Sequence, residues 1–163
     1  MVPPTKRGEL HAQFAAHFQC GEPPQMYQEL ALDAIEEALD TTLPLSYRQF
    51  MRRVGPVHTP AILDRIVARQ LDHPDLNHLL SPDDVIKNTR GYWAAGMPAD
   101  VIGIASDSMG SMFGFRRMSR REAHPDDLPV WFFDHDYMSL KQQAESFDAL
   151  LGWYLSQLAR MER

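Results

Sequence analysis

The residues best suited to chemistry stand together in the last third of the chain, where Asp134, His135 and Asp136 are consecutive and His124 precedes them. Carboxylate and imidazole groups are common ligands of zinc and manganese. A small metal-dependent hydrolase that uses these four residues is therefore one hypothesis. However, the His-x-x-x-His and Cys-x-x-Cys spacings are absent, and neighbouring side chains on a strand point to opposite faces. A polar turn after a buried strand is the preferred interpretation, and we expect no metal and no other cofactor.

A second candidate is Ser106-Asp107-Ser108, whose hydroxyl groups are nucleophile candidates. The nucleophile elbow of α/β-hydrolases requires Gly-x-Ser-x-Gly between a strand and a helix, whereas this segment joins two strand-like runs. Turn chemistry explains it better, because Asp107 is a turn former and Gly110 can adopt a positive φ angle. We assign these two residues a structural role in a turn. No catalytic residue is predicted, and the protein is expected not to be an enzyme.

A basic cluster follows the second strand-like run and consists of Arg116, Arg117, Arg120 and Arg121. Arginines can bind phosphates or carboxylates through paired hydrogen bonds. A solvated loop is the preferred alternative, because Glu122, Asp126 and Asp127 balance the charge nearby. The candidate contacts to a partner are then Arg116 and Arg117 from this cluster and the triplet from Asp134 to Asp136.

The overall charge limits the class of partner. The chain of 163 residues has 22 acidic and 16 basic side chains and a formal charge of −6. Such a surface repels phosphate backbones, so we expect no nucleic acid partner. It favours encounter with a basic protein instead. With 44% hydrophobic residues, the chain is expected to form one globular domain.

The compartment is predicted from what the sequence lacks. Cys20 is the sole cysteine, so no intramolecular disulfide can form, which suits a reducing compartment. The first ten residues contain no apolar run typical of a secretory signal. No segment approaches the roughly 20 apolar residues that span a bilayer. We therefore expect a cytoplasmic protein without a membrane partner.

Hydrophobic periodicity and capping signals predict five helices before the strands. Their expected ranges are Gly8–Gln19, Gln25–Asp40, Tyr47–Val54 with Ser46 as its cap, Pro60–Leu71, and Ser81–Ala95. The last of these has the clearest start, with a capping hydroxyl, a proline at the first helical position and two carboxylates.

The period then changes from helical to alternating. Val101–Ala105 and Met112–Phe115 are predicted to form a β-hairpin, and Leu128–Phe133 an interior strand because both of its faces are apolar. The stretch after Leu140 is open: either one long helix to Arg160, or a short strand to Ala144 followed by a helix that Ser146 caps. The predicted fold is α+β, a mainly antiparallel sheet with helices packed on one face.

Three stretches together resemble the SUKH superfamily, in its Smi/Knr cell-wall-assembly-regulator-like branch. They are Ala34–Leu39 followed by Leu-Pro-Leu-Ser-Tyr at 43–47, the hairpin over Ile104–Phe115, and Pro129–Asp136 followed by Ser-Phe-Asp at 146–148. The resemblance favours a strand over Leu140–Ala144 and a helix from Ser146. It gives a SUKH-like domain over residues 25–163, with a helical extension over residues 1–24 that it does not cover.

The resemblance also implies a function. Members of the superfamily act as immunity proteins that bind and neutralise bacterial toxin domains, and fungal members regulate cell-wall synthesis through partner proteins. Neither role uses catalytic residues. A protein-binding module is therefore implied, either an immunity protein that meets a basic toxin domain or a regulatory scaffold with another partner.

Overall fold

The computed structural model describes residues 4–120 and 123–159. The helices in these ranges are α1 (Pro4–Phe18), α2 (Glu29–Leu39), α3 (Leu45–Arg53), α4 (Ala61–Ala68), α5 (Pro82–Ala94) and α6 (Phe147–Leu158). The strands are β1 (His78–Leu79), β2 (Val101–Ser106), β3 (Met112–Arg116), β4 (Val130–Asp134) and β5 (Ser139–Ala144). The α+β class is confirmed.

The strands form one sheet in the order β1-β2-β3-β4-β5, and every neighbouring pair is antiparallel. The predicted hairpin is present as β2 and β3, and Gly110 in its turn has a φ angle of 89°. The open question after Leu140 is resolved in favour of a strand and a capped helix, because the Ser146 hydroxyl accepts a hydrogen bond from Ala149 N in the first turn of α6.

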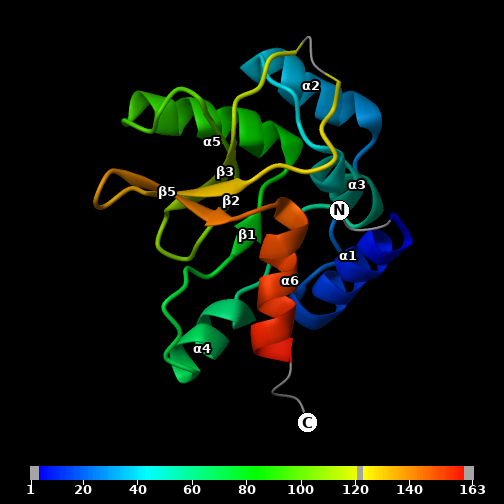
Figure 1. Ribbon diagram of the computed structural model, residues 1–163, viewed down its shortest axis with the longest axis vertical. Coiled ribbons are helices and arrows are strands. Elements are labelled where there is room, and N and C mark those ends of the chain that lie inside the picture. Colours follow the sequence, from blue (N-terminus) through cyan, green and yellow to red (C-terminus); the bar gives the residue numbers. More distant parts are fainter. Residues whose placement is uncertain (1–3, 121–122, 160–163) are drawn as a thin grey trace.

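The helices lie on both sides of the sheet, which differs from the expectation of a single covered face (Figure 1). Cross-strand pairs share a face, so the pairing of Ile102 with Phe115 and of Gly103 with Gly114 separates the two faces. Rings of α3 and α6 pack on Phe115. On the other face Thr89 of α5 exchanges hydrogen bonds with the backbone of Gly103.

The reason for the second layer is the composition of β2. All of its residues from Val101 to Ala105 are buried, so an uncovered face would expose apolar surface to water. Glycine at position 103 also leaves room, because a Cβ atom there would meet the Met112 side chain at 2.8 Å.

Asp127 joins the segments that carry the family resemblance. Its Oδ1 accepts hydrogen bonds from Ser46 Oγ at 2.7 Å and from Phe147 N at 2.9 Å, and its Oδ2 accepts from Asp148 N at 3.1 Å. The prediction that Ser46 caps α3 is wrong, since the N-cap is Pro44 and Ser46 is the second residue of the helix. Ser46 therefore donates a hydrogen bond to a carboxylate distant in the sequence and does not cap its own helix.

Helix α1 is tied into the same region. Arg7 donates to Asp148 Oδ2 at 2.7 Å and to both carboxylate oxygens of Asp126, and His11 Nε2 lies 2.8 Å from Asp148 Oδ1. Burial favours the neutral form of Asp148, but the bonds from His11 and Arg7 outweigh it and lower the pKa of this carboxyl. We call Arg7, His11, Asp126, Asp127 and Asp148 the aspartate hub.

Candidate functional site

Two turns lie side by side at one end of the sheet. The β2–β3 turn spans residues 107–111 and the β4–β5 turn spans residues 135–138, and Met112 of the central strand pairs with both Ser106 and Phe133. The turns are bonded to each other, because Ser111 Oγ lies 3.0 Å from His135 Nδ1 and accepts a hydrogen bond from His135 N. We call residues 107–111 and 134–138 the turn end.

A polar pocket of about 340 Å³ opens on one side of the turn end. Its charged and polar members are Asp72, His73, Asp107, Ser111, Asp134, Asp136 and Lys141. In Figure 1 the loop after α4 passes near the β2–β3 turn. We call this pocket the acidic hollow.

Asp107 organises the turn beside the hollow. Its Oδ1 accepts hydrogen bonds from Met109 N at 3.0 Å and from Ser111 N at 2.7 Å. Burial raises the pKa of the Asp107 carboxyl, and the nearby charge of Asp75 raises it further. Asp75 itself is held by Ser108, whose hydroxyl donates to it at 3.0 Å.

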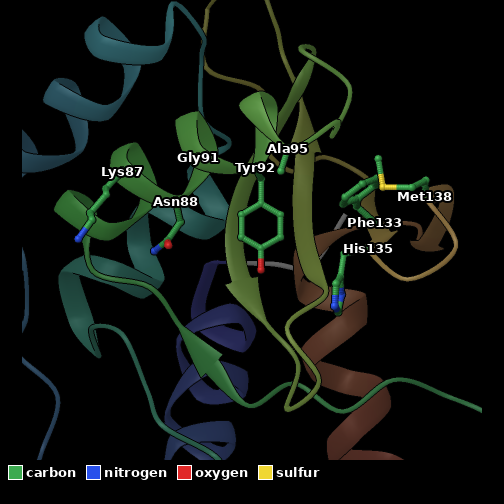
Figure 2. A pocket seen from close by; sticks show the side chains of 8 residues that line it. All are labelled: Lys87, Asn88, Gly91, Tyr92, Ala95, Phe133, His135 and Met138. Atoms are coloured by element: carbon green, nitrogen blue, oxygen red, sulfur yellow. The ribbon is translucent and has the colours of Figure 1, made fainter.

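A second, mostly apolar pocket of about 530 Å³ opens between α5 and the β4–β5 hairpin. Figure 2 shows Tyr92 of α5 facing Phe133, His135 and Met138 across it. The Tyr92 hydroxyl donates a hydrogen bond to Gly110 O, so the β2–β3 turn is bonded to α5. His135 lines this apolar pocket, whereas its neighbours Asp134 and Asp136 line the acidic hollow.

The metal hypothesis gains three of its four ligands from the structure. One ligand atom each of Asp134, His135 and Asp136 lies within 4.8 Å of the others. His124 is not among them and pairs with Glu36 of α2 at 2.9 Å. The Asp134 carboxylate also accepts hydrogen bonds from Asp136 N and Tyr137 N, as expected of a polar turn. The four-ligand set of the hydrolase hypothesis is therefore not assembled.

The two candidate arginines lie at the opposite end of the sheet, since Arg116 pairs with Val101 at the start of β2. Arg116 forms an ion pair with Asp100 and lies over the Trp131 ring. Arg117 lies over the Trp93 ring and donates to Leu39 O at 3.0 Å. Of the remaining cluster, Arg121 lies outside the described residues. The candidate contacts are thus split between the two ends.

Comparison with known proteins decides the family. The model of the SMI1/KNR4 family (SUKH-1) matches residues 28–153. The chain belongs to this family. A crystal structure of a protein from Pseudomonas syringae pv. tomato is 17% identical, with a TM-score of 0.51 over 95% of this chain and 96% of that one. This likeness shows the fold alone. No curated protein matches the sequence.

The SMI1/KNR4 match begins after α1 and includes every strand of the sheet. Its motif residues Leu43, Tyr47 and Phe147 are fully buried, and Asp148 belongs to the aspartate hub. These three motif residues are therefore core positions, and they do not themselves mark a binding surface.

The residues of the site that were not among the sequence candidates include Tyr92, Met109, Tyr137 and Met138. Met109 is 71% exposed, Tyr137 81% and Met138 53%. A signal was present, because each stands among Ser, Asp, His and Gly in a predicted turn of this SMI1/KNR4 protein, where no core position is expected. Tyr92 gave no such signal, since a tyrosine at a helix end is commonly a core residue.

Proposed function

We propose that this protein is an immunity-type binding module that neutralises a cognate bacterial toxin domain by covering its active surface. The observation that carries the proposal is the match to the SMI1/KNR4 (SUKH-1) family over most of the chain. Membership of this family implies a protein-binding role. The turn end supports it further, because exposed apolar side chains beside charged groups are typical of interaction surfaces.

On this proposal the protein acts by binding and not by catalysis. A binding surface needs complementary area and a few anchor residues. The groups of the site are engaged as turn formers: Asp107 and Asp134 bind backbone N–H groups, and Ser111 binds His135. A nucleophile would need a hydroxyl bonded to a base that a third group orients. His135 Nε2 does lie 3.3 Å from Asp136, but His135 is only half-buried and Asp136 is an exposed residue of the same turn.

The partner is proposed to be a basic protein domain met in the cytoplasm. The formal charge of −6 favours such a partner and disfavours nucleic acid. The sole cysteine, Cys20, is exposed and unpaired, which suits a reducing compartment. Among the described helices, none is both long and apolar enough to cross a bilayer. A regulatory scaffold with another protein partner is the second candidate.

The test is co-expression with the effector domain encoded by the neighbouring gene, together with purified binding kinetics. We expect growth rescue and association that slows as salt rises toward physiological strength, where the Debye length shortens to about 8 Å. Dissociation should change less, because buried anchors govern it. If the protein gives no growth protection and does not bind at micromolar concentration, immunity to that effector is excluded.

A further inference from the structure

The acidic hollow concentrates the negative charge of the protein. It contains Asp72, Asp107, Asp134 and Asp136 against one lysine, Lys141. Burial lowers the pKa of His73, which keeps this imidazole neutral at pH 7. Four carboxylates and one ammonium give the hollow a formal charge of −3, half of the −6 of the whole chain. Its charge is therefore complementary to a cation.

The geometry of Asp107 leaves part of this charge available. Both backbone N–H groups that bond to it reach the same oxygen, Oδ1. Among the hydrogen bonds between described residues, none reaches Oδ2. Asp107 is only 9% exposed, and a carboxylate held in such a place is stabilised by any positive charge that enters the hollow.

Apolar anchor positions surround the same turns. Six large apolar side chains are strongly exposed among the described residues: Met26, Leu30, Val67, Met109, Tyr137 and Met138. Three of these six belong to the turn end, where Met109 lines the acidic hollow and Met138 lines the apolar pocket. Tyr137 lies between the triplet of Asp134 to Asp136 and Met138 in the sequence. Charge and apolar surface thus meet within one turn.

We propose that the turn end recognises a protein segment that places an arginine side chain in the acidic hollow and a neighbouring aromatic side chain in the apolar pocket. Arginine fits better than lysine, because its planar fork of donors can bond to several carboxylates at once. The aromatic side chain fits the pocket of Tyr92, Phe133 and Met138, since rings and thioethers pack favourably. This inference rests on the proposed function and names the recognition chemistry of its toxin domain.

The first experiment uses small probes in place of the toxin domain. Acetyl-Arg-Phe-amide and acetyl-Phe-Arg-amide are titrated into the ¹⁵N-labelled protein at millimolar concentration, with citrulline replacing arginine as the neutral control. We expect amide shifts at Ser108, Met109 and His135, and binding about tenfold weaker for the citrulline peptides, since charged hydrogen bonds are lost. Shifts elsewhere, no shifts, or equal binding of citrulline peptides would overturn the proposal.

The second experiment compares variants with matched controls. Asp136→Asn and Tyr137→Ala should each weaken binding of the peptides and of the effector domain by about tenfold. The control Glu37→Gln removes one exposed charge from α2, and Leu30→Ala removes an apolar side chain as exposed as Tyr137, at 81%. Both controls should stay within about twofold of wild type.

The two experiments separate failure of the inference from failure of the proposed function. If the peptides bind at the turn end but no effector domain binds, the recognition chemistry stands and the immunity function fails. If the effector binds and protects while the turn-end variants behave like their controls, the immunity function stands and the recognition site is wrong. Urea midpoints equal to or above that of wild type establish that each variant is folded, and Asp107→Asn provides a further variant within the hollow.

Discussion

The aspartate hub and the turn end both contain a buried carboxylate, and the pKa of the two carboxyl groups is shifted in opposite directions. At the hub, Asp148 is bonded by Arg7 and His11, and its pKa is lowered despite burial. At the turn end, Asp107 has backbone partners on one oxygen and Asp75 beside it, and burial with that neighbouring charge raises its pKa. Asp148 of the hub is thus paired with a guanidinium, whereas the hydrogen bonds that Asp107 accepts at the turn end come from backbone N–H groups.

This difference assigns the two regions to different tasks. A paired and hydrogen-bonded buried charge specifies how segments join. An unpaired charge near the surface costs stability, and such a cost is common where function requires it. Substitutions at the hub should therefore lower stability, whereas substitutions of exposed side chains at the turn end should change binding and leave stability nearly intact.

The largest effect on stability is expected for Phe147→Ala. Phe147 is fully buried and packs against the rings of Tyr47, Phe50 and Phe115. Loss of such a ring leaves a cavity and costs about 3–5 kcal/mol of unfolding free energy. Urea denaturation measures it, with the exposed Tyr137→Ala as a control expected within about 0.5 kcal/mol. Equal losses in both variants would contradict the expected difference between a core ring and an exposed ring.

The next largest effect is expected for Arg7→Met, which removes the cation of the hub. The Arg7 side chain is 3% exposed and Asp148 1%, so the substitution leaves a buried carboxylate without its guanidinium. Breaking a buried pair costs about 3 kcal/mol or more. Arg116→Met is the matched control, because its pair with Asp100 is 44% and 46% exposed and should contribute under about 1 kcal/mol. If Arg7→Met loses no more unfolding free energy than this control, the ion pair between α1 and Asp148 does not stabilise the fold.

A smaller loss is expected for Gly110→Val in the β2–β3 turn. The φ angle of 89° at this position strains a β-branched residue, and the cost should exceed the roughly 0.5–1 kcal/mol of ordinary propensity changes. Gly91→Ala is the control, since Gly91 lies within α5 with open space around it and should gain stability. Coincident urea midpoints for Gly110→Val and wild type would contradict the strain.

Local signals made much of the fold predictable. The start of α5 could be predicted because Ser81, Pro82 and the following carboxylates act within one helical turn, and Ser81 Oγ does accept from Asp84 N at 3.3 Å. The β2–β3 hairpin was equally local. By contrast, β1 has two residues and depends on distant partners, because it pairs with Ala105 and Ser106 of β2 and His78 also forms a bridge with His58. The role of Ser46 depends on Asp127, 81 residues away. Neither contact leaves a local pattern.

The candidate site was predictable only in part, for the same reason. The triplet Asp134–Asp136 and the turn residues Asp107 and Gly110 were identified from their own neighbours in the sequence. Their combination with Asp72 and Tyr92 requires α5 and the loop after α4 to pack beside the turns. Arg116 and Arg117 were grouped with the triplet by residue type, although antiparallel pairing places them at the other end of the sheet.

The smallest expected effect is also the most direct comparison of the two carboxylates. Asp107→Asn keeps an acceptor for both backbone N–H groups and removes the charge. A folded pKa raised above the unfolded value of about 3.9 means that ionised Asp107 costs stability at neutral pH and that this cost disappears as pH falls through the raised pKa. The variant should therefore gain less than about 1 kcal/mol at pH 7, and the gain should shrink toward pH 4. Asp148 has the opposite sign: its lowered pKa contributes stability above about pH 3.9 that is lost as pH falls through the folded pKa. The difference between the urea midpoints of wild type and variant from pH 7 to pH 3 measures the Asp107 contribution, and the fall of both midpoints toward pH 3 includes the Asp148 contribution. A variant less stable than wild type at pH 7 would mean that the Asp107 charge is already matched within the fold, and the turn end would then lack the unpaired carboxylate that a partner cation is proposed to meet.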